Sequence, residues 1–163
     1  AEAAARPILA ALQSVEGRGG IEVRLRAGAP VPVGDYIFWD AESSPALRAL
    51  CEHAQQAVRP QLGMQKMPPW CDKLPAAEQA SRRVYLDRFG TVNAGEFFRP
   101  HVTLAYVHGS RIPAIILPES NFRVSRLHVS AVGEYGTVLS DGEFGSVQLT
   151  AAPSPLGPLA ACV

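Results

Sequence analysis

Residues 99 to 107 read Arg-Pro-His-Val-Thr-Leu-Ala-Tyr-Val, and this stretch decides the fold class. Proline is tolerated only at the beginning of a strand or on its edge, so we predict a strand that begins at Pro100 or just after it. Alternation along a strand sends His101 and Thr103 to one face and the apolar residues between them to the other. The sequence therefore predicts a strand that packs through one face and presents an imidazole and a hydroxyl on the other.

Helices and strands are interspersed around this strand without strict alternation. Apolar spacing predicts helices over residues 2–16, 44–58 and 75–88, and alternation predicts strands at 21–25, 36–39, 122–129 and 146–150. We expect the first two strands to form a hairpin, and Ser44-Pro45 to begin the second helix. This order favours an α+β fold over a doubly wound sheet, with two lobes of antiparallel or mixed sheet around a central cleft and helices outside.

Length and composition fit one domain. The 163 residues predict a single unit with approximate lobes 1–42 and 43–152 and an irregular tail, 153–163. Fifteen Lys and Arg balance fifteen Asp and Glu, so no global field attracts DNA or a membrane surface. No apolar run approaches the length of a membrane span, and no signal-peptide pattern opens the chain. We expect a monomer in the cytoplasm that binds neither DNA nor membrane.

The three cysteines, Cys51, Cys71 and Cys162, form neither a CxxC pair nor a zinc pattern. Cys51 falls on the apolar face of the predicted second helix and is expected to pack as a small hydrophobic residue. One disulfide among the three stays open. The cysteine usage favours a reducing compartment.

His101 and Thr103 carry the chemistry that the sequence suggests. Two residues along a strand are about 6.6 Å apart, so both side chains can converge on one tetrahedral anion. A histidine can give or accept a proton near neutral pH, and the threonine hydroxyl can hold a phosphate oxygen. Arg99 has the same parity and is expected to add positive charge. The structural alternative is a strand histidine that is satisfied by a backbone carbonyl.

Residues 93 to 104, Asn-Ala-Gly-Glu-Phe-Phe-Arg-Pro-His-Val-Thr-Leu, resemble the second catalytic strand of the two-histidine phosphoesterase superfamily. This superfamily includes the so-called 2′-5′ RNA ligases and the cyclic nucleotide phosphodiesterases. Residues 35–40 and 44–50 resemble the strand and helix that precede that motif. Residues 122–129 resemble the strand that follows it.

The resemblance implies two similar α+β lobes around a cleft, each of which supplies one His-x-Thr/Ser motif. One histidine activates water or a hydroxyl, the other protonates the leaving oxygen, and the two hydroxyls bind phosphate. Neither a metal nor another cofactor is implied. The implied substrates are 2′,3′-cyclic phosphates or 2′-5′-linked nucleotides and RNA ends, with His101 and Thr103 as catalytic residues and Arg99 at the substrate.

The sequence departs from this pattern because no first motif is evident. His53 lies on the predicted second helix and fails the motif, whereas His128-Val129-Ser130 matches it on the following strand. Three explanations stay open: a first-motif strand lies outside this chain, the site is degenerate, or His128 and Ser130 form an unusual second pair with His101 and Thr103.

Three functions follow from these alternatives. The first is a metal-independent phosphodiesterase that acts by paired-histidine acid–base catalysis. The second is a catalytically degenerate nucleotide- or phosphate-binding module, in which Trp70, Phe97 and Phe98 stack bases, although such residues more often pack in a core. The third is an unrelated α+β domain in which His101 is structural.

Overall fold

The computed structural model describes residues 2–107, 114–132 and 138–149. Within these residues, three α-helices combine with antiparallel strands, and this confirms the α+β class. The helices are α1 (Glu2–Leu12), α2 (Pro45–Val58) and α3 (Ala76–Phe89). The strands are β1 (Ile21–Leu25), β2 (Val31–Val33), β3 (Tyr36–Asp40), β4 (His101–Tyr106), β5 (Ser120–Val124), β6 (Arg126–Val132) and β7 (Val138–Gln148). The predicted tail, 153–163, lies outside the described residues.

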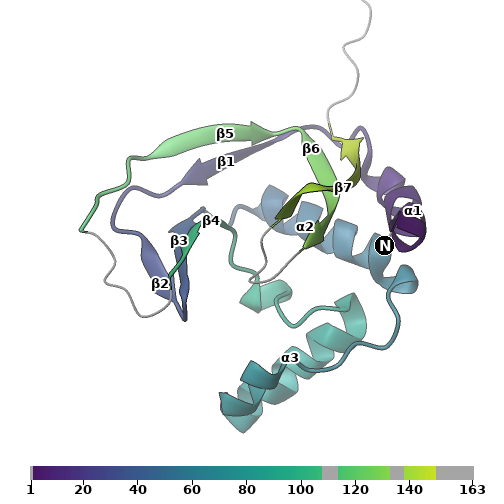
Figure 1. Ribbon diagram of the computed structural model, residues 1–163, viewed down its shortest axis with the longest axis horizontal. Coiled ribbons are helices and arrows are strands. Elements are labelled where there is room, and N and C mark those ends of the chain that lie inside the picture. Colours follow the sequence, from purple (N-terminus) through teal and green to yellow (C-terminus); the bar gives the residue numbers. More distant parts are fainter. Residues whose placement is uncertain (1, 108–113, 133–137, 150–163) are drawn as a thin grey trace, which may run out of the picture.

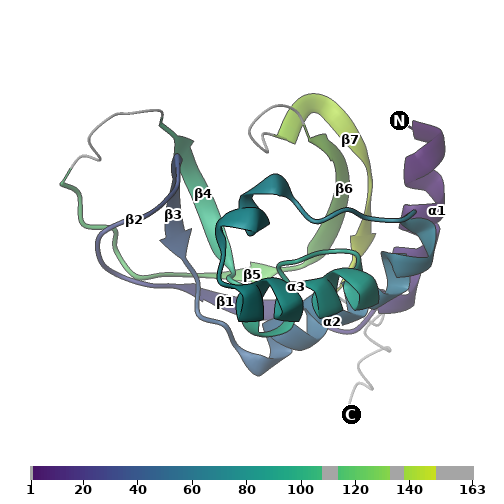
Figure 2. The ribbon, with the colours of Figure 1, turned by 90° about the horizontal axis from the view of Figure 1, so that it is seen from below.

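The strands form three small groups in the order β1–β5, β2–β3–β4 and β6–β7. The long β1–β5 ribbon connects the other two groups, with β2–β3–β4 at one end and β6–β7 at the other (Figure 1). Seen from below, β4 and the β6–β7 pair rise from opposite ends of this ribbon, and α2 and α3 lie along the same side of it (Figure 2). None of the described helices is long and apolar enough to cross a membrane.

The predicted hairpin between residues 21–25 and 36–39 is wrong. β1 pairs with β5, with Val23 opposite Phe122, and β3 pairs with β2 on one side and with β4 on the other. The expected turn at 28–34 contains β2, and Gly34, with φ of +59°, makes the tight turn into β3. The hairpin therefore exists, but its first strand is β2.

The predicted single strand at 122–129 is two strands that separate at Ser125. β5 ends at Val124 and pairs with β1, whereas β6 begins at Arg126 and pairs with β7. The Ser125 carbonyl accepts a hydrogen bond of 2.8 Å from the Leu149 N–H, so the bend is held by the residue that follows β7. The apolar positions change parity at this bend, from Phe122 and Val124 to Leu127 and Val129, so the break is visible in the sequence.

Backbone hydrogen bonds around Ala41 join the β1–β5 ribbon to the sheet of β4. The Arg26 N–H donates to Asp40 O at 2.9 Å, and the Glu42 N–H donates to Arg24 O at 2.8 Å. On the opposite edge, the Ala41 N–H donates to Pro100 O at 2.9 Å. The chain just before β4 is therefore tied through residues 40–42 to the ribbon.

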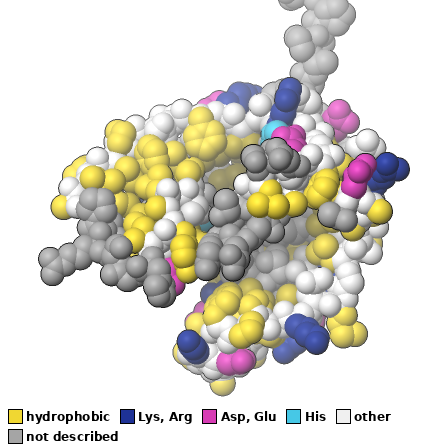
Figure 3. Space-filling model, viewed as in Figure 1, with side chains coloured by type: hydrophobic (Ala, Val, Ile, Leu, Met, Phe, Trp, Pro, Cys, Tyr) yellow, Lys and Arg dark blue, Asp and Glu magenta, His cyan; other side chains and the backbone are white. Residues whose placement is uncertain are grey.

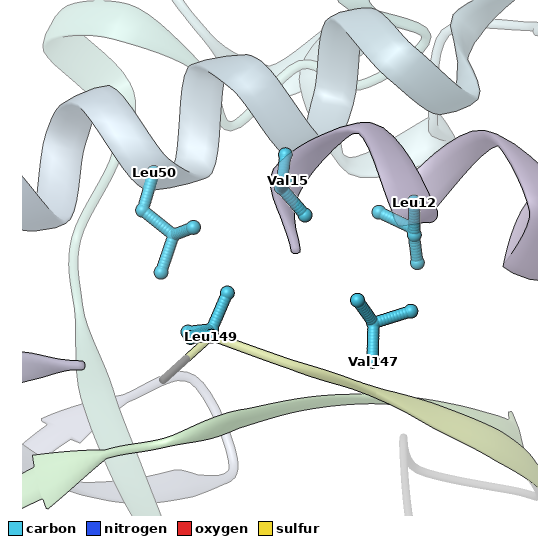
Figure 4. Close-up of a cluster of buried hydrophobic side chains, with 5 residues drawn as sticks. All are labelled: Leu12, Val15, Leu50, Val147 and Leu149. Atoms are coloured by element: carbon cyan, nitrogen blue, oxygen red, sulfur yellow. The ribbon is translucent and has the colours of Figure 1, made fainter. Parts of the chain in front are cut away.

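The main core lies where α1, α2 and β7 meet. Five buried side chains form it: Leu12, Val15, Leu50, Val147 and Leu149 (Figure 4). The start of α2 is set by local chemistry, because the Ser44 hydroxyl accepts a hydrogen bond of 3.2 Å from the Leu47 N–H and Pro45 occupies the first turn. The predicted beginning of this helix is confirmed.

Leu149 tests how much this core contributes. Its side chain is 0% exposed, so Leu149→Ala should lower the free energy of unfolding by about 2–5 kcal/mol, measured by urea denaturation. Val84→Ala on α3, where the side chain is 62% exposed, is the control and should change it by less than about 0.5 kcal/mol. Equal effects of the two substitutions would contradict the placement of Leu149 in the core.

Candidate functional site

His101 and Thr103 lie on one face of β4, together with two residues of β3. His101 is opposite Asp40 and Thr103 is opposite Phe38, and the strand register shifts between Ile37 and Phe38. Because directly opposed residues share a face, these four side chains form one surface. Both His101 and Thr103 are exposed, so the predicted presentation of an imidazole and a hydroxyl is confirmed. The predicted packing of the opposite face is wrong, because Val102 and Leu104 on that face are 38% and 40% exposed.

The imidazole of His101 is held from two sides. Its Nδ1 lies 2.7 Å from the carbonyl oxygen of Arg99. Its ring stacks on Phe38, with 3.7 Å between the ring centroids and 24° between the planes. A carbonyl oxygen can only accept, so Nδ1 carries the proton and donates. In the neutral ring, Nε2 is then the acceptor, and it can take a proton from a bound hydroxyl or water.

This carbonyl contact is the one expected of a purely structural strand histidine. It satisfies Nδ1 alone, however, and the side chain remains exposed. Fixing one nitrogen is also what a general base requires, because it sets the tautomer and aims the other nitrogen outward. The contact therefore fits both interpretations of His101, and the exposure of the side chain is what the functional one requires.

Arg99 forms an ion pair with Asp40, and this changes its expected role as a source of positive charge. Its Nε and Nη2 donate to the two carboxylate oxygens of Asp40 at 3.0 and 2.8 Å, and its Cζ lies 5.8 Å from the Phe38 ring centroid. The hydrogen bond to Asp40 raises the pKa of Arg99. The carboxylate compensates the guanidinium charge, so Arg99 adds less net positive charge to the site than an unpaired arginine.

Sequence reasoning did not find Asp40 or Phe38. Both occur in the run 35–40, which resembled the strand that precedes the motif, but nothing local indicates that they face His101. The sequence does indicate that the two residues share a face with each other, because they are two residues apart on one strand. Knowing which face required the register with β4.

A hollow of about 320 Å³ opens beside the first residues of β4. Its walls come from β1, β5, the beginning of α2 and residues 98–102, and they are mostly apolar. Figure 3 shows hydrophobic side chains gathered over the part of this face that the β1–β5 ribbon and the β2–β3–β4 sheet form. Phe122 and Val102, which line the hollow, are 42% and 38% exposed.

His128 and Ser130 lie in a different sheet from His101. They belong to β6, where the His128 Nδ1 is 2.9 Å from a carboxylate oxygen of Glu143. Among the described residues, no hydrogen bond or ring contact joins His128 to His101. The two His-x-Thr/Ser motifs therefore lie on separate sheets, and their pairing in one site stays a prediction.

Two of the aromatic residues considered for base stacking hold the segment before β4. The guanidinium carbon of Arg82 lies 4.0 Å from the Phe97 ring centroid and 5.2 Å from that of Trp70. Arg82 also donates to Val92 O at 3.1 Å and to the Asn93 side chain at 3.0 Å. These contacts favour a packing role for Trp70 and Phe97, because the cation already occupies both rings.

The two described cysteines are free thiols with little reactivity. Burial, with a smaller contribution from Glu52, raises the pKa of Cys51 to about 11. Burial also raises the pKa of Cys71, whose side chain is 0% exposed. Cys51 lies on α2 and is partly buried, in agreement with the packing role that the sequence predicted for it.

Within the described ranges, no three His, Cys, Asp or Glu side chains gather closely enough to hold a metal ion.

Comparison with known protein families, with curated proteins and with solved structures finds no match. The resemblance to the two-histidine phosphoesterases therefore depends on the sequence alone, chiefly on residues 93 to 104.

The protonation of His101 can be observed directly. At about pH 8, where a histidine is normally neutral, nitrogen-15 NMR should show the Nδ1–H tautomer of His101, because Arg99 O accepts from that nitrogen. His53, exposed on α2, is the reference. An Nε2–H tautomer at His101 would contradict the contact.

The thiols give a second test. In a Cys162→Ser variant at about pH 8, Cys51 should react with a disulfide reagent about a hundredfold more slowly in the native state than in the unfolded chain, and Cys71 should also react more slowly. The cause is that burial holds both thiols in the protonated form. Equal rates in guanidinium and in native buffer would show that neither thiol is protected.

Proposed function

We propose that this chain contributes one arm of a metal-independent phosphodiesterase that acts on 2′,3′-cyclic phosphates or 2′-5′-linked nucleotide and RNA ends. The observation that carries the proposal is the orientation of His101. Its Nδ1 is engaged by Arg99 O at 2.7 Å, and its exposed ring shares a face with the Thr103 hydroxyl. Nε2 would exchange the proton in the reaction, and the Thr103 hydroxyl would hold a phosphate oxygen.

The chemistry needs a second proton-transfer group. In hydrolysis of a cyclic phosphodiester, one group removes a proton from the attacking water and another gives a proton to the leaving ribose oxygen. Each such group contributes about a hundred- to ten-thousand-fold in rate. His101 can fill either role, so a single copy of the motif supports slow turnover at most.

A catalytically degenerate nucleotide- or phosphate-binding module is the second candidate. Two observations favour it: the described residues place one His-x-Thr motif on this surface, and Asp40 compensates the charge of Arg99. On this alternative, His101 and Thr103 bind the phosphate group through hydrogen bonds and the bound nucleotide is released unchanged.

We also propose a reducing, cytoplasmic setting, which the free thiols of Cys51 and Cys71 support.

Hydrolysis of 2′,3′-cyclic AMP in excess chelator tests the proposal. His101→Ala should lower the turnover by about a hundred- to ten-thousand-fold, because it removes the proton-transfer group. His53→Ala and His128→Ala are matched controls and should leave turnover unchanged, since neither residue lies on the face of His101.

Activity that survives His101→Ala would eliminate the proposed role of this residue. Binding without turnover, seen as a rise in melting temperature with 2′,3′-cyclic AMP that His101→Ala abolishes, would select the binding module instead. A loss of activity in His128→Ala equal to that in His101→Ala would revive the pairing of the two motifs.

A further inference from the structure

β4 is an outer strand of its sheet among the described residues, with β3 on one side. Hydrogen bonds at its two ends fix which residues face β3: the Ala41 N–H donates to Pro100 O, and the Val107 N–H donates to Asp35 O. In an antiparallel ladder, hydrogen-bonded and non-bonded pairs alternate. Asp40 and His101 therefore exchange no backbone hydrogen bonds, and the same holds for Phe38 and Thr103. The backbone N–H and C=O groups of His101 and Thr103 consequently point away from β3.

Over residues 101–106, this edge lacks the charged side chains and prolines that normally prevent strands from pairing. Edge strands are usually protected by charged side chains, prolines or coverage. β4 reads His-Val-Thr-Leu-Ala-Tyr and contains no Asp, Glu, Lys or Arg. Val102 and Leu104 are 38% and 40% exposed. The nearest charged residue along the chain, Arg99, is neutralised by Asp40.

We propose that two copies of this chain pair through their β4 edges, antiparallel about a twofold axis at Val102, and that the two His101–Thr103 motifs form one composite site. The proposal rests on the function proposed above and replaces the expectation of a monomer. A second copy fits because the edge is self-complementary: the outward groups of His101 meet those of Thr103 of the partner subunit, and no like charges oppose each other.

The register places the reacting groups together. His101 and the partner subunit's Thr103 form a hydrogen-bonded pair, with Cα atoms about 5.5 Å apart, and directly opposed residues share a face. The partner subunit's His101 is the diagonal neighbour, about 7–8 Å away. One phosphate group can then contact both hydroxyls and lie between both imidazoles, so that one imidazole accepts the proton of water and the other protonates the leaving oxygen.

Val102 gives the first test, because it meets Val102 of the partner subunit at the axis on the opposite face of the sheet. In the full chain, Val102→Lys places two ammonium groups against each other. Light scattering after size exclusion should give twice the chain mass for the unmodified protein and the single mass for Val102→Lys. Val84→Lys on α3, where Val84 is also exposed, is the control and should stay dimeric. A single mass for the unmodified chain at all concentrations would overturn the proposal.

Mixed dimers give the second test. With 2′,3′-cyclic AMP and chelator, a ninefold excess of His101→Ala chain should lower the turnover per unmodified chain by about tenfold, because most unmodified chains then pair with a chain that lacks the second histidine. Dilution should also lower turnover per chain.

The outcomes separate this inference from the proposed function. Turnover proportional to chain concentration and unaffected by the His101→Ala chain would overturn the composite site and leave the proposed function intact. A dimer that Val102→Lys dissociates, but that hydrolyses no cyclic phosphate, would overturn catalysis and leave the pairing intact.

Discussion

Three backbone hydrogen bonds around Ala41 hold the strand of His101 to the rest of the protein. Residues 40 and 42 bond to the end of β1, and Ala41 itself bonds to Pro100 on the opposite side. A small sheet of three short strands has little stability alone. Through this junction, β4 is connected to the β1–β5 ribbon and to the buried cluster of Val23, Leu25 and Ala41. The site is therefore exposed but is built on a supported strand.

The segment before β4 is fixed as firmly as the strand. Gly95 has φ of +57°, and a Cβ there would collide with the ring of Tyr85 on α3. Arg82 holds the backbone at Val92 and covers the Phe97 ring. These contacts fix the backbone that leads to Arg99, whose guanidinium pairs with Asp40. The carbonyl oxygen of Arg99 in turn accepts from Nδ1 of His101 and orients its ring. Residues 93 to 104 are thus held in place by α3 and by the pairing of Arg99 with Asp40.

The sequence predicted those features of the fold that depend on residues close together in the chain. The Ser44-Pro45 helix start and the shared face of His101 and Thr103 depend on neighbours within a few residues, and both were found from the sequence. The partner of β1 could not be found, because β5 lies about a hundred residues away and pairing follows the global packing. Asp40 and Phe38 were missed for the same reason: their position against His101 depends on the register of two strands distant in the sequence.

On the proposed function, the pairing of Arg99 with Asp40 also limits how the site would bind a phosphate group. An unpaired arginine would attract the anion by net charge, but here the carboxylate takes both donors that face it. Attraction must then come from hydrogen bonds of the Thr103 hydroxyl, of the imidazole and of backbone N–H groups. Such a site favours a single phosphodiester over a long polyanion, because strong binding of a nucleic-acid backbone needs several uncompensated cations. The balanced charge of the whole chain acts in the same direction, so selectivity of the proposed site would depend on geometry at His101 more than on electrostatic attraction.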